Sequence, residues 1–217
     1  MGRRSLRKID PQLDLSRHYF EWAAAPRPLP LDDWLAPTGP LEIEIGSGKG
    51  LFLEHASGSR PGHRFVGIEL AGKYARFAAA RLAKASRTNA LVVHGDAFDV
   101  LREGLPASSA HAVHIYFPDP WWKKRHHKRR IMNEPFIDQV VRILQPGGEL
   151  HFWTDVQEYF QLGLELLQRF QQLEGPHPVP PAEPQHDLDY RTHFERRVRL
   201  AGLPVYRSQF TRRSMSG

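Results

Sequence analysis

Short apolar stretches alternate with longer amphipathic segments from residue 41 to the end of the chain. The short stretches are rich in β-branched and aromatic residues and predict strands, whereas the longer segments repeat apolar positions at roughly 3.6-residue intervals and predict helices. Strands are predicted at 41–45, 63–70, 89–95, 111–117, 148–154 and 204–211, and helices at 51–58, 71–86, 98–105, 133–145, 156–173 and 191–201. This alternation predicts an α/β domain with a mostly parallel sheet, whose ligands bind beyond the carboxyl ends of the strands.

The first forty residues follow a different pattern. A basic start is followed by "HYFEWAA" (18–24) and by the proline-rich run "APRPLPLDDWLAPTGP" (25–40). We therefore expect a basic N-terminal arm and proline-rich lead-in at 1–40, and a single domain at 41–217. The proline-rich stretch at 175–187 predicts a loop.

Composition narrows the class of protein. The chain has 217 residues, a formal net charge of +6 and no cysteine. The absence of cysteine excludes disulfides, thiolate catalysis and zinc–thiolate sites, and it suits a reducing cytoplasm. No apolar run approaches the roughly 20 residues that cross a bilayer, so we expect no membrane contact. The basic balance favours a polyanionic partner.

A glycine-rich loop, "EIGSGKG" (44–50), directly follows the first predicted strand. A phosphate-binding P-loop requires glycine where Ile43 stands and Ser or Thr where Gly50 stands, so the loop is not a P-loop. The spacing of Gly46, Gly48 and Gly50 is also one residue shorter than the dinucleotide fingerprint. Taken alone, the loop is equally consistent with a tight turn that holds no ligand.

Acidic residues at the ends of the next two strands favour a ligand. Glu69 ends the second predicted strand, and a carboxylate there accepts hydrogen bonds from both hydroxyls of a ribose in nucleotide-binding sheets. Asp96 follows the third strand, where it can accept from an adenine amino group, although such an acid is commonly a helix N-cap. Together these features resemble the class I S-adenosylmethionine-dependent methyltransferases, in which the position of Glu44 faces the amino-acid end of the cofactor.

The segment "FPDPWWKKRHHKRR" (117–130) places one acid beside a strongly basic run. Prolines on both sides of Asp119 restrict the backbone, so the turn either presents a preorganised carboxylate or is a capped turn without chemistry. Six cations in eight residues would repel one another unless an anion lies against them, and nucleic-acid phosphate is the expected anion. The adjacent tryptophans either stack on bases or are buried in a core. Adjacent His126 and His127 cannot both face one metal ion from a regular element, so no metal site is expected.

Five motifs in this order, "EIGSGKG", "GIEL", "FPDPWWKKRHHKRR", "TDVQEY" and "RTHFERR", resemble the tRNA (guanine-N7)-methyltransferase family. The resemblance covers residues from about 41 to 210. It implies a Rossmann-like class I methyltransferase fold, with a mostly parallel seven-stranded sheet and helices on both faces. It also implies S-adenosyl-L-methionine as cofactor and tRNA as partner; no obligate protein partner is evident.

The resemblance assigns roles by position. It implies that Asp119 is the catalytic residue and that the cofactor is bound by Glu44, Gly46, Gly48, Glu69, Asp96 and Asp119. It implies that the substrate contacts Lys123, Asp155, Thr192, His193, Phe194 and Glu195. It implies that RNA contacts Arg125, His126, His127, Lys128, Arg129 and Arg130.

The implied chemistry suits a carboxylate that does not act as a base. Guanine N7 carries an in-plane lone pair, so no proton has to leave before methyl transfer, and Asp119 is expected to orient the ring and stabilise its developing positive charge. Asp155 and Glu195 are expected to accept hydrogen bonds from the N1 and amino edge of guanine. Three alternatives remain: a methyltransferase for another RNA or an exocyclic amine, a non-catalytic RNA-binding subunit, and, weakest, a nicotinamide-dependent dehydrogenase.

Overall fold

The computed structural model describes residues 6, 8–121, 125, 130–179, 195 and 200–214. Eight strands form a single sheet across this part of the chain. The strands are β1 (Tyr19–Glu21), β2 (Leu41–Ile45), β3 (Arg64–Glu69), β4 (Ala90–His94), β5 (Ala110–Tyr116), β6 (Leu144–Thr154), β7 (Leu173–Pro178) and β8 (Tyr206–Arg212). The helices are α1 (Leu31–Trp34), α2 (Leu51–Ser59), α3 (Gly72–Lys84), α4 (Ala97–Asp99), α5 (Glu134–Ile143) and α6 (Gln157–Leu167), and a π-helical turn covers Val100–Gly104.

The strand order is β1-β4-β3-β2-β5-β6-β8-β7. Neighbouring strands are parallel except at β8, which runs antiparallel to both β6 and β7. The chain builds outward from β2 through β3 and β4, then returns to the other side of β2 with β5. This reversal lies between β2 and β5, and ligands in open parallel sheets bind at such a point, beyond the carboxyl ends of the strands.

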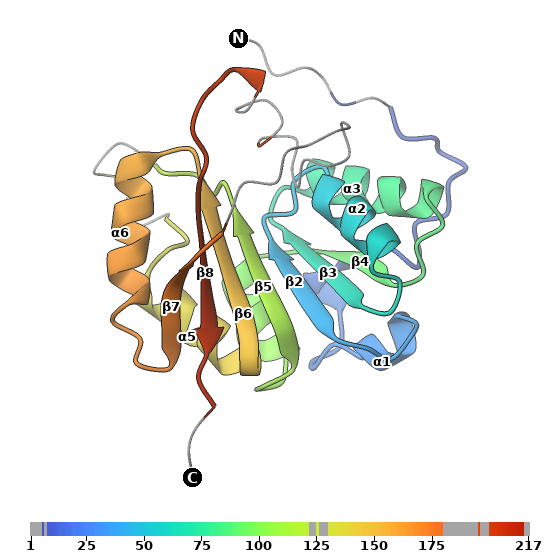
Figure 1. Ribbon diagram of the computed structural model, residues 1–217. Coiled ribbons are helices and arrows are strands. Elements are labelled where there is room, and N and C mark those ends of the chain that lie inside the picture. Colours follow the sequence, from blue (N-terminus) through green and yellow to red (C-terminus); the bar gives the residue numbers. More distant parts are fainter. Residues whose placement is uncertain are drawn as a thin grey trace.

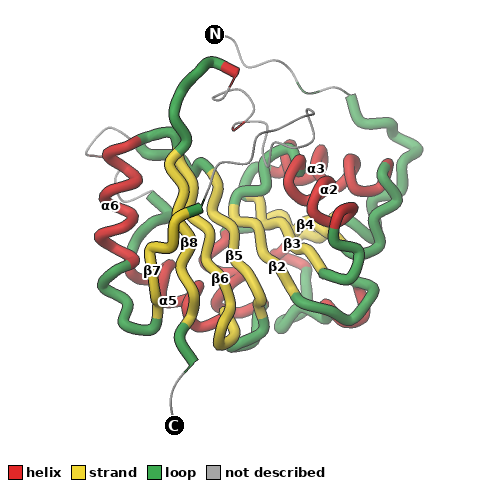
Figure 2. The backbone as a smooth tube through the Cα atoms, in the orientation of Figure 1, coloured by secondary structure: helices red, strands yellow, loops and turns green. Residues whose placement is uncertain are grey.

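Helices pack on both faces of the sheet, as Figures 1 and 2 show for α2 and α3 against α5. On one face, α2 and α3 cover β2, β3 and β4 through the cluster that contains Phe52, Leu53 and Phe65. The opposite face holds a larger core that contains residues of α5 and α6, including Ile137 and Leu167. In the part of the chain that the structure describes, no helix is long and apolar enough to cross a membrane.

The α/β fold class is confirmed, and the six strands predicted from the pattern are all present within a few residues of their expected bounds. Two strands were not predicted, and the sheet has eight strands where seven were expected. Strand β1 is only three residues long, which is too short to show alternation. Strand β7 has the sequence "LEGPHP", and its proline and glycine argued for a loop. Proline is tolerated there because β7 is an edge strand.

Candidate cofactor and substrate site

The glycine loop after β2 is packed on one side and open on the other. Gly46, Gly48 and Gly50 have φ values of 72°, 53° and 70°, which glycine adopts without a steric penalty. A Cβ atom at Gly50 would lie 2.7 Å from the Cβ of Ala78 in α3, so this glycine lets the loop rest on the helix. A Cβ atom at Gly46 would meet nothing within 4 Å. The loop therefore has room for a ligand on its Gly46 side.

Glu69, at the end of β3, is tied to this loop. Its Oε2 accepts a hydrogen bond of 2.8 Å from the backbone N–H of Gly48, and its Oε1 accepts one of 2.8 Å from the N–H of Ala71. The carboxylate is thus held in one orientation by two backbone donors at the carboxyl edge of the sheet.

Glu44, the second-last residue of β2, is a buried acid, and one of its two carboxylate oxygens lacks a hydrogen-bond partner. It is 3% exposed, and its Oε2 has no hydrogen-bond partner. Burial, reinforced by the nearby charge of Glu69, raises the pKa of Glu44 well above its usual value of 4.5. A cationic group beside Oε2 would complete its hydrogen bonding and favour ionisation. The ammonium of an amino-acid moiety has this chemistry, so these residues fit the methionine end of S-adenosyl-L-methionine.

Asp96 follows β4 on the same edge of the sheet and is exposed. Its Oδ1 accepts from the N–H of Phe98 at 2.8 Å, so it caps α4 as such an acid commonly does. This contact occupies one carboxylate oxygen. Its expected role toward adenine stays a prediction.

The turn after β5 is constrained from both ends. Phe117 and Trp121 have φ values of 50° and 42°, a left-handed backbone region that is costly for bulky side chains and that marks functional turns. The N–H of Phe117 donates to the carbonyl of Trp153 at 2.8 Å, and Nε of Arg130 donates to the carbonyl of Pro120 at 2.7 Å. Between these anchors, Asp119 is exposed. The structure thus presents a carboxylate to solvent on a fixed backbone.

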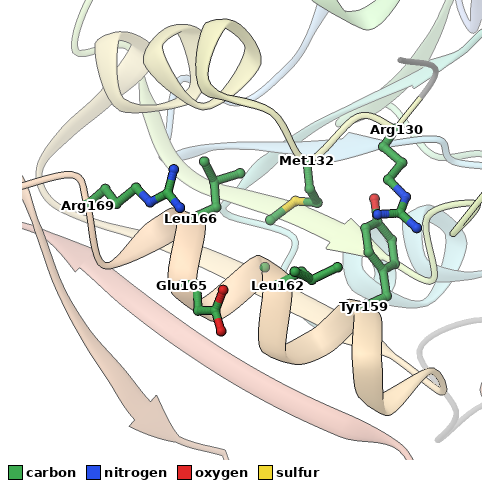
Figure 3. A pocket seen from close by; sticks show the side chains of 8 residues that line it. Arg130, Met132, Tyr159, Leu162, Glu165, Leu166 and Arg169 are labelled. Carbon is green, nitrogen blue, oxygen red and sulfur yellow. The ribbon is translucent and has the colours of Figure 1, made fainter. Parts of the chain in front are cut away.

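A cleft of about 200 Å³ lies beside this turn, between residues 130–132 and α6. Figure 3 shows Arg130 next to the ring of Tyr159 at one end and Arg169 at the other, with Met132 and Leu162 between them. The guanidinium of Arg130 lies 5.2 Å above the ring of Tyr159. Burial raises the pKa of Tyr159 to about 12 despite the opposing charge of Arg130.

The residues expected at the guanine differ in their surroundings. Asp155 is half-buried directly after β6. Glu195 is buried, and its Oε1 accepts from the guanidinium of Arg207 at 3.0 Å. Arg207 in turn lies 4.8 Å above the ring of Trp153. Glu195 is therefore anchored to β8, an ion pair that the sequence did not predict.

Several predicted site residues lie outside the described part of the chain. They are Lys123, Thr192, His193, Phe194, His126, His127, Lys128 and Arg129. Of the expected RNA-contacting segment, Arg125 is exposed and Arg130 is half-buried. The structure brings Glu44, Gly46, Gly48 and Glu69 together, and it places Asp96 and Asp119 beyond strands of the same edge.

A buried polar network under the site was missed by the sequence analysis. Glu42 accepts from Nε2 of His114 at 2.7 Å, and Nδ1 of His114 lies 2.9 Å from the hydroxyl of Tyr116, the residue before the turn. Arg60 and His63 pair with the other oxygen of Glu42 at 2.9 and 2.7 Å. Burial, which would raise the pKa of Glu42, is outweighed by His114, Arg60 and His63, so the pKa falls to about 2. The signal was the alternation in "LEIEI", which puts both acids of β2 on one face.

Comparisons with known proteins show which family the chain resembles. A family model described as "Putative methyltransferase" matches residues 38–208. A tRNA (guanine-N(7)-)-methyltransferase of Rhodopirellula baltica is 49% identical, over 99% of this chain and 81% of that protein. A protein of the same name from Bordetella pertussis is 36% identical, over 87% of this chain and 73% of that protein.

Solved structures show the same fold at low sequence identity. The aminoglycoside resistance methyltransferase NpmB1 is similar with a TM-score of 0.53 and 23% identity, over 80% of this chain and 87% of that one. The precorrin-6y C5,15-methyltransferase of Geobacter metallireducens has a TM-score of 0.53 and 18% identity, over 81% and 80% of the two chains. From the sequence matches along nearly its whole length, the chain belongs to the tRNA (guanine-N(7)-)-methyltransferase family.

Proposed function

We propose that the protein transfers a methyl group from S-adenosyl-L-methionine to N7 of a guanosine in tRNA. The observation that carries this proposal is the 49% identity to a tRNA (guanine-N(7)-)-methyltransferase over 99% of the chain. Geometry supports it, because a buried carboxylate oxygen of Glu44 without a hydrogen-bond partner lies beside a glycine loop with an open side.

In this proposal, each residue at the carboxyl edge of the sheet contacts a different part of the cofactor. Glu44 accepts from the ammonium of the methionine moiety, Gly46 and Gly48 let the backbone approach it closely, and Glu69 accepts from the ribose hydroxyls. Asp96 accepts from the adenine amino group with the oxygen that does not cap α4. When bound there, S-adenosyl-L-methionine supplies an electrophilic methyl group on a sulfonium.

Asp119 acts on the guanine rather than on a proton. N7 bonds to the methyl carbon with its own lone pair as the bond from that carbon to the sulfonium sulfur breaks, so positive charge passes from the sulfur to the ring. A carboxylate fixed near the ring stabilises that charge without reorganising, which is the most effective form of electrostatic catalysis. The anchored backbone at Phe117 and Arg130 supplies the required fixed position.

RNA contacts the basic segment. The run from residue 123 to 130 directly follows the catalytic turn in the sequence, and its positive charge binds phosphates without reading bases. Asp155 and Glu195 then select guanine through its N1 and amino edge. In this role Glu195 is anchored by its ion pair with Arg207.

The test is methylation of unmodified bulk tRNA with labelled cofactor, followed by nucleoside analysis. We expect label in 7-methylguanosine. Label in another nucleoside would show a different RNA methyltransferase, and cofactor binding without any methylation of tRNA would contradict the proposal.

The role of Asp119 is tested by Asp119→Ala and Asp119→Asn in the same assay. We expect kcat to fall by about 100-fold or more, since removing one preorganised electrostatic group costs roughly that much. Binding of tRNA should be nearly unchanged. Asp138→Ala, which removes an exposed aspartate on α5, is the matched control. Turnover by Asp119→Ala at the wild-type rate would refute the role.

A further inference from the structure

The N-terminal strand lies against the adenosine side of the site. Strand β1 pairs in parallel with β4, so that Glu21 stands opposite His94 at the carboxyl end of both strands. Nδ1 of His94 lies 2.6 Å from Oε2 of Glu21, and its Nε2 lies 3.2 Å from the carbonyl oxygen of Leu70. Leu70 directly follows Glu69. The imidazole therefore joins β1 to the backbone beside the expected ribose-binding carboxylate.

Both ring nitrogens of His94 face oxygens that can only accept a hydrogen bond from the ring; these include the hydroxyl oxygen of Tyr19, 3.2 Å from Nδ1, because that hydroxyl donates its proton to Oε1 of Glu21. A backbone carbonyl has no proton to give, and neither has an ionised carboxylate. Glu21 is ionised, because hydrogen bonds from the hydroxyl of Tyr19 and from His94 lower its pKa. Their effect outweighs that of burial, which acts in the opposite direction. Both nitrogens must then donate, and only the doubly protonated imidazolium has two N–H groups.

One peptide group connects this imidazolium to Glu69. The carbonyl of Leu70 and the N–H of Ala71 belong to the same planar peptide unit, and that N–H donates to Oε1 of Glu69 at 2.8 Å. Fixing the oxygen at one end of a rigid plane fixes the direction of the N–H at the other. Hydrogen bonds in such a chain also polarise one another, so a charged donor at His94 strengthens the bond to Glu69.

The surroundings leave room for this arrangement and add one further charge. A Cβ atom at Gly72 would lie 3.0 Å from the ring of His94, so glycine at the start of α3 admits the imidazole. The guanidinium of Arg76 in α3 lies 5.0 Å above the ring of Tyr19, and the hydroxyl of Tyr19 lies 3.2 Å from Nδ1 of His94.

We propose that His94 is a positioning residue for cofactor binding: held as an imidazolium by Glu21 of β1, it orients the Leu70–Ala71 peptide and through it the carboxylate of Glu69. The N-terminal strand is in this way part of the cofactor site. The inference rests on the proposed function, in which Glu69 binds the ribose.

The test measures cofactor affinity against pH by calorimetry, with the full chain and S-adenosyl-L-methionine. Wild-type affinity should weaken by about twofold to fivefold as the pH is raised, a range set by partly exposed ion pairs. Glu21→Gln should abolish this weakening. Its amide can donate to the deprotonated Nδ1, so that neutral His94 still donates to Leu70. His94→Phe should bind weakly at every pH and show no such transition.

Ionisation of Glu44 also changes cofactor affinity with pH. The test is therefore the difference between the affinity–pH curves of Glu21→Gln and wild type, not the wild-type curve alone. The control is His111→Gln, a histidine at the amino end of β5 and so at the edge of the sheet away from the site. It should follow the wild-type curve of affinity against pH. Affinity for tRNA should be the same in all variants. The inference is overturned if Glu21→Gln retains the wild-type transition, or if a folded His94→Phe binds the cofactor as wild type does. A wild-type protein that binds no cofactor would instead contradict the proposed function.

Discussion

Glu42 and Glu44 stand two positions apart on one face of β2, yet their surroundings act on the two charges in opposite directions. Glu42 has three cationic or hydrogen-bonding neighbours, and its pKa falls to about 2. Glu44 has burial and the charge of Glu69, and its pKa rises. The first acid stabilises the folded chain as an anion, whereas the second is left in an unfavourable state that a bound cation relieves. Within one strand, this difference separates a structural acid from the acid that we propose binds the cofactor.

Glu44→Gln should stabilise the ligand-free protein while weakening cofactor binding. Above about pH 4.5 the unfolded chain loses the Glu44 proton and the folded chain keeps it, so stability falls as pH rises toward the elevated folded pKa. Glutamine has no such penalty. At about pH 7 we expect the free energy of unfolding to increase by on the order of 1–3 kcal/mol, because each pKa unit is worth about 1.4 kcal/mol.

The measurement is urea denaturation at about pH 7 and about pH 4, where the stabilisation should disappear. In calorimetry, the same variant should bind S-adenosyl-L-methionine about tenfold more weakly or worse, since one partner of a buried charge pair is lost. A variant that is both less stable at neutral pH and unchanged in affinity would show that Glu44 has another role.

At the scale of the element, the loop between β2 and α2 combines two functions in three glycines. Gly50 lets the loop pack on α3, and Gly46 leaves open space, where we propose that the cofactor approaches. Both have positive φ, so the backbone cost of a side chain is similar at the two positions. The difference between them lies only in what the new Cβ atom would meet.

Gly50→Ala and Gly46→Ala should therefore separate folding from binding. Gly50→Ala combines the positive φ with a 2.7 Å contact to Ala78 and should lower the free energy of unfolding by roughly 2–4 kcal/mol. Gly46→Ala should cost only about 1 kcal/mol for its backbone. Its cofactor affinity should fall more than that of a folded Gly50→Ala. Thermal unfolding and calorimetry check both, and equal destabilisation by the two substitutions would contradict the packing argument.

At the scale of the whole molecule, strand and helix alternation predicted the sheet and the edge that holds the candidate site residues, because both follow from local periodicity and from the rule for parallel sheets. The identity of Glu69 and Asp96 as strand-end acids followed from the same pattern. Partners far apart in sequence were not predictable. His114 is 72 residues from Glu42, and Arg207 meets Glu195 only because β8 returns to the sheet. Short β1 and proline-containing β7 gave no periodic signal at all.

The basic segment should govern how tRNA binding depends on salt. Changing Lys128, Arg129 and Arg130 to alanine should weaken binding and reduce the slope of log affinity against log salt by about one for each lost phosphate contact. Filter binding at several salt concentrations measures this. Since Arg130 also donates to the carbonyl of Pro120, the double variant Lys128→Ala/Arg129→Ala separates RNA contact from damage to the turn.

Lys84→Ala, at the far end of α3, removes a positive charge away from the site and is the control. Its slope should equal that of wild type. An unchanged slope in the double and the triple variants would remove this segment from the RNA interface.

Strand β1 has one more consequence, which concerns solubility. It is the only neighbour of β4 on its outer side, within the sheet that the structure describes. Without it, the edge of an apolar strand of sequence "ALVVH" would expose unpaired backbone groups. Such edges recruit strands from other copies. A shortened chain beginning after residue 25 is therefore expected to aggregate, so expression trials that trim this region would lose the protein to precipitation.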